Sequence, residues 1–252
     1  MSKTVDFDRV ADLYDSYVAT DLDIPFFLTE AQAADGDILE LMCGTGRVTI
    51  PLLQRGLKIT CVDYSPKMLD KFREKIQDTD LEVELIEADV KKLDLGRKFS
   101  LIYIPFHAFQ EILGEDEQRE ALSRIREHLA DDGIFICTLQ NPKIRLQNCD
   151  GQLRVLGKFP HGGKDMLINI VFYQDPDTKI VHGFQFYEFY DKSGIMDEKR
   201  VLEIKFRLSE AYEFEKMAKS AGFKVERLYG DYMKGKFDRE KSPFMIFILS
   251  NK

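Results

Sequence analysis

The sequence predicts an α/β protein in which a doubly wound sheet carries an inserted antiparallel sheet. Between residues 36 and 150, short apolar runs that fit buried strands alternate with amphipathic helical stretches. The first of these runs, at residues 38–40, passes through a loop with two glycines into a helix. From residue 151 onward, long aromatic-rich runs with strand periodicity replace this alternation. The pattern therefore indicates a core at 36–150, an inserted sheet at 151–208 and a completing segment at 209–252.

The length and charge of the chain limit its architecture and its partners. The chain has 252 residues, with 44 acidic against 36 basic side chains and a net charge of −8. This length suits one domain with an insertion, or one large and one small domain, and supplies a full hydrophobic core. The acidic balance argues against non-specific attraction to phosphate backbones. We therefore expect no nucleic-acid partner.

Cysteine usage and hydropathy indicate the compartment. The four cysteines show no Cys-x-x-Cys spacing, which favours free thiols in a reducing cytosol over a zinc site or a disulfide framework. The amino terminus is polar and lacks the apolar stretch of a secretion signal. No uncharged apolar run reaches the roughly 18 residues of a membrane span. The sequence therefore predicts a cytoplasmic protein without a metal site or a membrane segment.

The glycine loop suggests a ligand site. Gly44 and Gly46 lie between the strand and the helix, where a residue without a side chain lets the backbone turn sharply and approach a ligand. The helix that follows would direct its free N–H groups and positive dipole end toward that ligand. A dinucleotide site would have a third small residue where Thr49 stands. This weakens the NAD or FAD interpretation, so a nicotinamide-dependent reductase is only an alternative.

A second acid follows the next strand. Asp63 ends the apolar run at residues 57–62, and neighbouring strand ends of an open parallel sheet face one crevice. Asp63 can there accept hydrogen bonds from both hydroxyls of a ribose. Ser65 before Pro66 predicts the amino cap of the next helix.

The other elements follow in order. Residues 1–35 predict an N-terminal helical segment, with a break near Pro25. The core predicts helices at 48–55, 66–77 and 115–129, strands at 57–62, 81–86, 99–104 and 134–139, and an acidic turn at 131–133. The inserted sheet of three or four strands has runs at 166–173, 181–190 and 201–208, with turns at 175–177 and 192–194. A helix at 209–221 and strands at 223–229 and 243–249 complete the fold.

Residues 40–46, Glu-Leu-Met-Cys-Gly-Thr-Gly, resemble the first motif of class I S-adenosylmethionine-dependent methyltransferases. The resemblance covers residues 37–142 well and the last helix and two strands moderately. It implies a Rossmann-like sheet of seven strands, S-adenosylmethionine as cofactor, and methyl transfer to a nitrogen or oxygen of a small-molecule acceptor. The sequence departs from the family at Met42, which stands where the first glycine is common.

The resemblance also implies which residues contact the cofactor. The stretch Tyr14-Asp15-Ser16-Tyr17 is similar to an amino-terminal lid of small-molecule methyltransferases, and Asp89 stands where the family takes the adenine amino group. The expected cofactor-binding residues are Tyr14, Glu40, Met42, Cys43, Gly44, Thr45, Gly46, Asp63, Tyr64, Ser65, Met68, Ala88, Asp89, Val90, Pro105 and Phe106.

The acceptor side is less specific in the sequence. We expect acceptor contacts from Tyr17, His107, Asn141 and Tyr187, with His107 or Tyr14 in a catalytic role. His107 could act as a general base, or its ring could line the pocket or cap a helix. The aromatic inserted sheet could form an acceptor pocket, an ordinary core or a homodimer interface. A methyltransferase acting on RNA or protein, or a non-catalytic cofactor-binding relative, remains an alternative.

Overall fold

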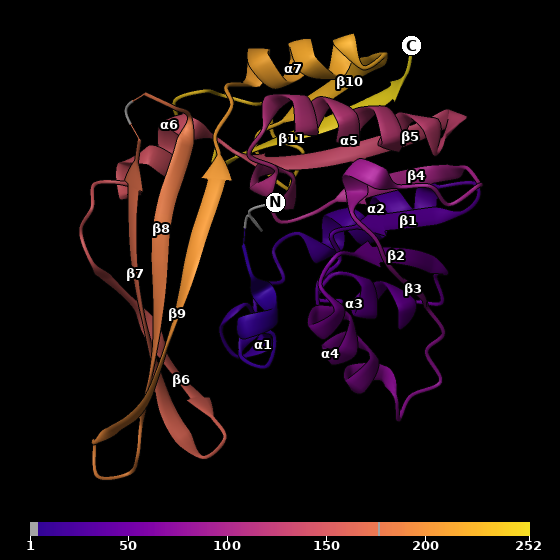
Figure 1. Ribbon diagram of the computed structural model, residues 1–252. Coiled ribbons are helices and arrows are strands. Elements are labelled where there is room, and N and C mark those ends of the chain that lie inside the picture. Colours follow the sequence, from indigo (N-terminus) through magenta and orange to yellow (C-terminus); the bar gives the residue numbers. More distant parts are fainter. Residues whose placement is uncertain (1–4, 176) are drawn as a thin grey trace.

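The computed structural model describes residues 5–175 and 177–252, which form a seven-stranded sheet beside a separate four-stranded sheet (Figure 1). The larger sheet has the order β10-β11-β5-β4-β1-β2-β3. Strands β1 to β5 run parallel, and β11 is antiparallel to both of its neighbours. These strands are β1 (Ile38–Leu41), β2 (Ile59–Asp63), β3 (Glu84–Glu87), β4 (Phe99–Ile104), β5 (Leu129–Gln140), β10 (Phe223–Tyr229) and β11 (Phe244–Asn251). The predicted doubly wound fold is confirmed.

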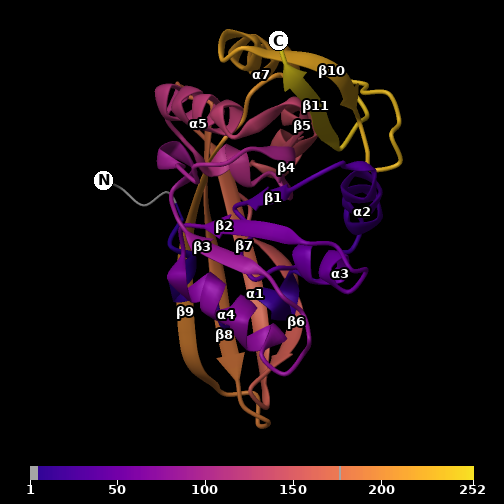
Figure 2. The same cartoon turned by 90° about the vertical axis from the view of Figure 1, so that its right-hand side faces the viewer.

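Helices cover both faces of this sheet, because alternate side chains of a strand point to opposite faces. Ile38 of β1 packs in the cluster formed with α2 (Ile24–Ala33), α3 (Thr49–Leu53) and α4 (Pro66–Ile76). Its neighbour Leu39 packs in the other cluster, with α5 (Glu115–Glu127) and α7 (Ala211–Ser220). Figure 2 shows α2 and α3 on one side of the sheet and α5 on the other.

The inserted sheet has four antiparallel strands in sequence order. They are β6 (Arg154–His161), β7 (Lys164–Gln174), β8 (Ile180–Tyr190) and β9 (Met196–Arg207). The first strand was not among the predicted runs, because Gly157 and Pro160 interrupt its strand pattern. One face of this sheet packs against the N-terminal segment through Val5, Val10 and Leu13.

The N-terminal segment is helical, as expected, but it is divided into three short pieces. It forms a short 3₁₀ turn η1 (Phe7–Arg9), one turn α1 (Tyr14–Tyr17) and then α2. The helical segment is interrupted near Pro25, as expected: α1 ends at Tyr17 and α2 begins at Ile24, and Pro25 stands in the first turn of α2, where its missing N–H costs nothing. In Figure 1, α1 lies between the inserted sheet and α3 and α4, so this segment bridges the two parts of the molecule.

Four short helical turns follow strands β3, β4 and β5. They are η2 (Val90–Lys92), η3 (Ala108–Glu111), α6 (Pro142–Arg145) and η4 (Leu146–Asn148). The acidic turn expected at 131–133 lies within β5, where pairing with β4 jumps from Phe99–Leu129 to Leu101–Ile134. Residues 1–4 of the expected N-terminal segment and Pro176 of the expected turn at 175–177 lie outside the described residues.

Two expectations from composition can be compared with the structure. Cys43, Cys61 and Cys137 are buried free thiols, and Cys149 is half-buried and free. Within the described residues, none of the helices combines the length and the apolar character that a membrane crossing requires.

Candidate functional site

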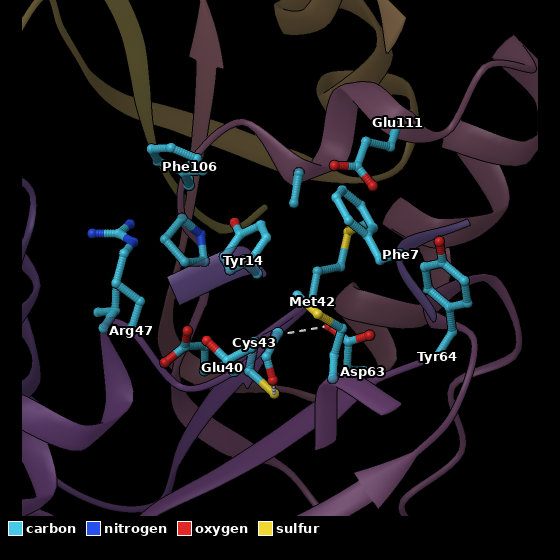
Figure 3. A pocket seen from close by; sticks show the side chains of 16 residues that line it. Phe7, Tyr14, Glu40, Met42, Cys43, Arg47, Asp63, Tyr64, Phe106 and Glu111 are labelled. Atoms are coloured by element: carbon cyan, nitrogen blue, oxygen red, sulfur yellow. Dashed lines mark hydrogen bonds between the residues drawn. The ribbon is translucent and has the colours of Figure 1, made fainter. Parts of the chain in front are cut away.

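A first cavity lies at the carboxyl ends of β1, β2 and β4. It holds about 590 Å³ of empty space, its open mouth included. Figure 3 shows Tyr14, Met42 and Phe7 in the middle of this cavity, with Arg47 toward one end and Tyr64 toward the other. Strand ends of an open α/β sheet are the usual place for a ligand crevice. The lining includes Glu40, Cys43, Gly44, Thr45, Asp63, Met68, Pro105, Phe106, Ala108 and Glu111.

The glycine loop makes three left-handed turns in five residues. The φ angles are +58° at Met42, +56° at Gly44 and +78° at Gly46. A Cβ at Gly46 would lie 2.5 Å from the Phe72 ring, so a side chain is excluded there. Met42 keeps the left-handed conformation at a cost of roughly 1–2 kcal/mol. The backbone at Met42 thus follows a path that glycine adopts freely, while its side chain occupies part of the cavity.

Asp63 at the end of β2 is held by backbone N–H groups. Its Oδ2 accepts a hydrogen bond from the Gly44 amide at 2.7 Å, and its Oδ1 accepts one from Ser65 at 2.9 Å. The side chain lines the cavity although only 7% of it is exposed. Burial raises the pKa of Asp63, and these backbone hydrogen bonds oppose that rise. The carboxylate is therefore fixed in one orientation at the cavity wall.

Glu40 at the end of β1 is buried beneath the loop. Its Oε2 accepts hydrogen bonds from the Thr49 hydroxyl at 2.6 Å and the Tyr103 hydroxyl at 2.8 Å. Burial raises the pKa of Glu40 to about 7 despite these two donors. Thr49 stands where a dinucleotide site would have its third small residue, and its hydroxyl is used here to hydrogen-bond Glu40.

A buried ion pair ties the N-terminal segment to the glycine loop. The guanidinium of Arg47 donates two hydrogen bonds to the Asp23 carboxylate, each at 2.6 Å. It also donates to the Thr20 carbonyl at 2.7 Å and lies 4.7 Å from the centroid of the Phe106 ring. Asp23 is 2% exposed, so this pair is shielded from water. Such fork-to-fork pairing fixes both position and orientation.

Two further carboxylates anchor the same segment. The Ser65 hydroxyl donates to Asp8 at 2.6 Å, and the Thr45 hydroxyl donates to Asp15 at 2.6 Å. Lys75 of α4 pairs with Asp15 at 3.0 Å. Together with Asp23, these residues attach the segment at both ends of the first cavity. The segment at 5–23 therefore covers this cavity.

A second, wider cavity lies between the core and the inserted sheet. It encloses about 1250 Å³, including space open to solvent, and we call it the acceptor cavity. The N-terminal segment supplies Tyr14 and residues 17–20. The turn after β4 supplies His107 and Gln110, the end of β5 supplies Gln140, and α6 supplies Arg145. The inserted sheet supplies Leu156, Ile170, Phe172, Gln185, Ile204 and Phe206.

The two cavities share part of their walls. Phe7, Tyr14, Phe106 and Glu111 border both of them. Burial raises the pKa of Glu111 to about 8, with a smaller contribution from the charge of Asp63. Glu111 was not among the predicted site residues. Its position depends on η3 turning back after β4, and no local sequence signal marks that turn.

The structure also separates the expected residues. Tyr14, Glu40, Met42, Cys43, Gly44, Thr45, Asp63, Tyr64, Met68, Pro105 and Phe106 line the first cavity, and Tyr17 and His107 line the acceptor cavity. Gly46 shapes the loop without lining the first cavity, and the Ser65 hydroxyl accepts from the Met68 amide as the cap of α4.

The segment expected to hold the adenine is not in the wall of either cavity. Ala88 packs against the core and Val90 is 6% exposed within it. Asp89 accepts from the Lys91 amide at 3.0 Å as the cap of η2. The structure thus gives these three residues packing and capping roles.

Two expected acceptor contacts also have structural roles. Asn141 is fully buried; its amide donates to the carbonyls of Arg239 and Ser242, and its oxygen caps α6. The side-chain groups of Asn141 are therefore engaged within the protein, and none of them is exposed to a cavity. Tyr187 is fully buried and its hydroxyl lies 2.9 Å from that of Tyr17. It therefore hydrogen-bonds the Tyr17 side chain and holds it in position.

His107 lines the acceptor cavity with a left-handed backbone, φ +63°. Its ring stacks between Phe106 and Phe244, with centroid distances of 5.2 and 5.5 Å. Burial, with the charges of Arg145 and Arg47, lowers its pKa to about 3. At neutral pH the imidazole is uncharged and a weak proton acceptor, so the geometry favours a wall residue over a general base.

Comparison with known proteins identifies a methyltransferase domain in the core of the chain. Residues 38–133 match the family model described as a methyltransferase domain. The CcbJ methyltransferase from Streptomyces caelestis superimposes with a TM-score of 0.84 at 25% identity, over 100% of this chain and 99% of that chain. An S-adenosylmethionine-dependent methyltransferase from Clostridium acetobutylicum gives a TM-score of 0.79 at 19% identity, over 97% and 98% of the two chains. The core of the chain therefore carries a methyltransferase domain, and the whole chain has the fold of S-adenosylmethionine-dependent methyltransferases.

The similarity extends to a sequence relative. The Bacillus subtilis protein YqeM, named as a methyltransferase, is 21% identical to this chain over 208 residues, which are 78% of this chain and 77% of the relative.

The chemistry of the first cavity fits S-adenosylmethionine. The ligand carries a sulfonium, an ammonium and a ribose diol, and the cavity offers the carboxylates of Asp63 and Glu40. Its apolar wall includes Met42 and Met68. Acidic groups at strand ends and an apolar wall match a cationic, partly apolar ligand.

Proposed function

We propose that this methyltransferase transfers a methyl group to a nitrogen of a small molecule bound in the acceptor cavity. The observation that carries this proposal is the shared wall: Phe7, Tyr14, Phe106 and Glu111 border both cavities. Ligands in the two cavities would meet at this wall. When bound, S-adenosylmethionine supplies an electrophilic methyl group on a sulfonium sulfur. The chain must then align the nucleophile, which can contribute roughly 7–11 kcal/mol of barrier reduction.

The proposal assigns the cofactor to residues of the first cavity. Asp63 would accept hydrogen bonds from the ribose, because its carboxylate is fixed at the wall beside the glycine loop. Glu40 would attract the positive methionine part from beneath the loop. Met42, Met68 and Tyr64 would cover apolar portions of the ligand.

Two polar side chains of the shared wall suit a nitrogen acceptor. An ammonium must lose a proton before its lone pair can attack. Within residues 5–175 and 177–252 the Glu111 carboxyl has no hydrogen-bond partner, and its raised pKa of about 8 matches proton acceptance near neutral pH. The Tyr14 hydroxyl stays protonated because burial raises its pKa well above the ordinary value. Glu111 would take the proton and Tyr14 would orient the amine.

The names of several relatives support nitrogen over oxygen. The cypemycin N-terminal methyltransferase of a Streptomyces species is 26% identical over 63% of this chain. The glycine/sarcosine N-methyltransferase of Aphanothece halophytica is 26% identical over 41% of it. A malonyl-[acyl-carrier protein] O-methyltransferase of Acetivibrio thermocellus, 24% identical over 63%, represents the oxygen alternative. Nitrogen also suits the carboxyl at the shared wall.

Mass spectrometry with methyl-deuterated S-adenosylmethionine tests the proposal. The purified protein is incubated with arylalkyl amines and amino acids, each paired with its hydroxy analogue. We expect a labelled methyl group on amines and none on the paired alcohols. Glu111→Gln should lower the rate by about 10²-fold or more while cofactor binding persists, as expected for loss of a positioned base.

Other results would contradict the proposal. Labelled alcohols would indicate an O-methyltransferase, and labelled RNA or protein with no labelled small molecule would indicate a macromolecular acceptor. Full activity of Glu111→Gln at every pH would remove Glu111 from proton transfer. As a surface control, Glu115→Gln changes an exposed acid of α5 and should leave the rate unchanged.

A further inference from the structure

A guanidinium without an acidic partner lies in the wall of the acceptor cavity. Arg145 is the last residue of α6, and its Cζ lies 4.3 Å from the centroid of the Phe172 ring and 5.0 Å from that of Phe206. Its Nε is buried without a hydrogen-bond partner, and in the described part of the chain it forms no ion pair. The other cationic group near these walls, Arg47, is neutralised by Asp23. Arg145 therefore remains available to a ligand.

The surroundings of Arg145 do not compensate its charge. Burial lowers the pKa of the guanidinium, and the neighbour that opposes this shift is the thiol of Cys149. Across the cavity wall lies His107, which is uncharged and whose own pKa Arg145 helps to lower. A charge removed from water without a counterion is costly unless a ligand supplies one. An anion entering the cavity would restore that balance.

The fold holds Arg145 in place. Asn141 caps α6 and bonds the Arg239 and Ser242 carbonyls, which fixes the start of the helix beside β5. The rings of Phe172 and Phe206 pack edge to face at 5.9 Å, and both contact the guanidinium. A guanidinium stacked on aromatic faces keeps its N–H edges available for a bidentate acceptor.

We propose that Arg145 binds an anionic group of the acceptor, a carboxylate or a phosphate, so that the substrate is an amine carrying an acidic group. The acceptor's apolar portion would pack on Leu156, Ile170 and Ile204, which line the same cavity. The description of the ligand as the methyl acceptor rests on the proposed function. The anion site itself rests on Arg145 and its surroundings alone.

Binding of small probes tests the anion site without any methyl transfer. Isothermal titration calorimetry compares phenylacetate and phenyl phosphate with the neutral, similarly shaped phenylacetamide, each added to the full chain saturated with S-adenosylhomocysteine. We expect at least one anion to bind tenfold or more tightly than phenylacetamide, with an advantage that falls as salt rises. The tighter of the two anions identifies carboxylate or phosphate as the preferred group.

Variants assign the effect to Arg145. Arg145→Met keeps a long apolar chain against the two rings and should remove the preference for anions while phenylacetamide binds as before. Arg145→Lys retains the positive charge but loses the paired N–H donors of the guanidinium, so it should keep part of the preference for anions. Arg119→Met, on an exposed arginine of α5, should keep all of it. Retained phenylacetamide binding shows that the Met variant is folded.

Two outcomes would overturn the inference: equal binding of anionic and neutral probes to the unaltered protein, or an unchanged preference in Arg145→Met. These outcomes are distinct from failure of the proposed function. If anions bind through Arg145 but no amine is methylated, the anion site stands and the proposed reaction fails. If neutral amines are methylated and anions show no preference, the reaction stands and the anion site fails.

Discussion

The hydroxyl of Thr49 donates a 2.6 Å hydrogen bond to the buried carboxylate of Glu40. A small residue at this position of the loop would leave that acid with Tyr103 as its remaining side-chain donor. Thr49 thus explains why the loop departs from the dinucleotide pattern: the third position serves the acid of β1, and the close approach of helix to strand is obtained with a hydroxyl between them.

Thr49→Val keeps the shape of the side chain and removes this donor. We expect a loss of about 1–3 kcal/mol in the free energy of unfolding. The bond favours ionised Glu40, whose pKa is about 7, so the loss should be larger at pH 8.5 than at pH 5.5. Urea unfolding at both pH values measures it. Thr29→Val, on an exposed hydroxyl of α2, provides the control and should change stability little at either pH.

Asp63→Asn replaces a carboxylate that accepts from two backbone amides. One oxygen becomes an NH₂ group that cannot accept, so both the loop contact and the proposed ribose contact suffer. We expect the dissociation constant for S-adenosylmethionine to rise about tenfold to a hundredfold, as measured by calorimetry. An unchanged constant would exclude Asp63 from the cofactor site. Asp131→Asn, whose side chain is 96% exposed, should bind the cofactor normally.

Asp23→Ala leaves the Arg47 guanidinium buried without its acid. Removing one partner of a buried pair costs about 3–5 kcal/mol, whereas exposed pairs contribute roughly 0–1 kcal/mol. Denaturant unfolding should therefore separate Asp23→Ala from Asp70→Ala, which breaks an exposed pair with Arg73. Limited proteolysis should also cut residues 5–23 faster in the first variant. Equal stability of the two variants would show that the pair does not hold the segment.

Glu111 gives the protein a pH dependence that can be measured. Its pKa in the folded state is about 8 against an ordinary value of 4.5, so the folded protein holds the proton more tightly. Stability from this group is complete below about pH 4.5 and is lost as pH rises toward 8, by about 4–5 kcal/mol. Thermal unfolding of Glu111→Gln should show a smaller decline between pH 5 and pH 8.5. An identical decline in both proteins would indicate an ordinary pKa for Glu111.

Local signals predicted some parts of the site and not others. The left-handed glycines, the acid at the end of β2 and the Ser65 cap depend on residues close in sequence, and the structure has all three. Glu111 and Arg145 reach the acceptor cavity because two turns and the inserted sheet bring them there, and no sequence spacing encodes that meeting. Short motifs predict the local backbone conformation, but they do not predict which distant side chains meet in the folded protein.

The same limit applies to two residues that we expected to contact ligands and that the structure uses as caps. Asn141 stands at a strand end, where a ligand contact and a cap look alike in sequence, and the carbonyls it bonds lie about a hundred residues further along the chain. Asp89 follows a strand in the same way and caps η2. In both residues a side-chain oxygen accepts a hydrogen bond from a nearby backbone amide.

One segment has to serve both ligands. Residues 5–23 cover the first cavity, where we propose that the cofactor binds. Tyr14 together with residues 17–20 forms a wall of the acceptor cavity. If this segment moves to release the demethylated cofactor, it also removes one wall of the acceptor cavity. An acceptor that is methylated twice on one nitrogen should therefore dissociate between the two transfers. The singly methylated compound should accumulate in solution before the doubly methylated one appears.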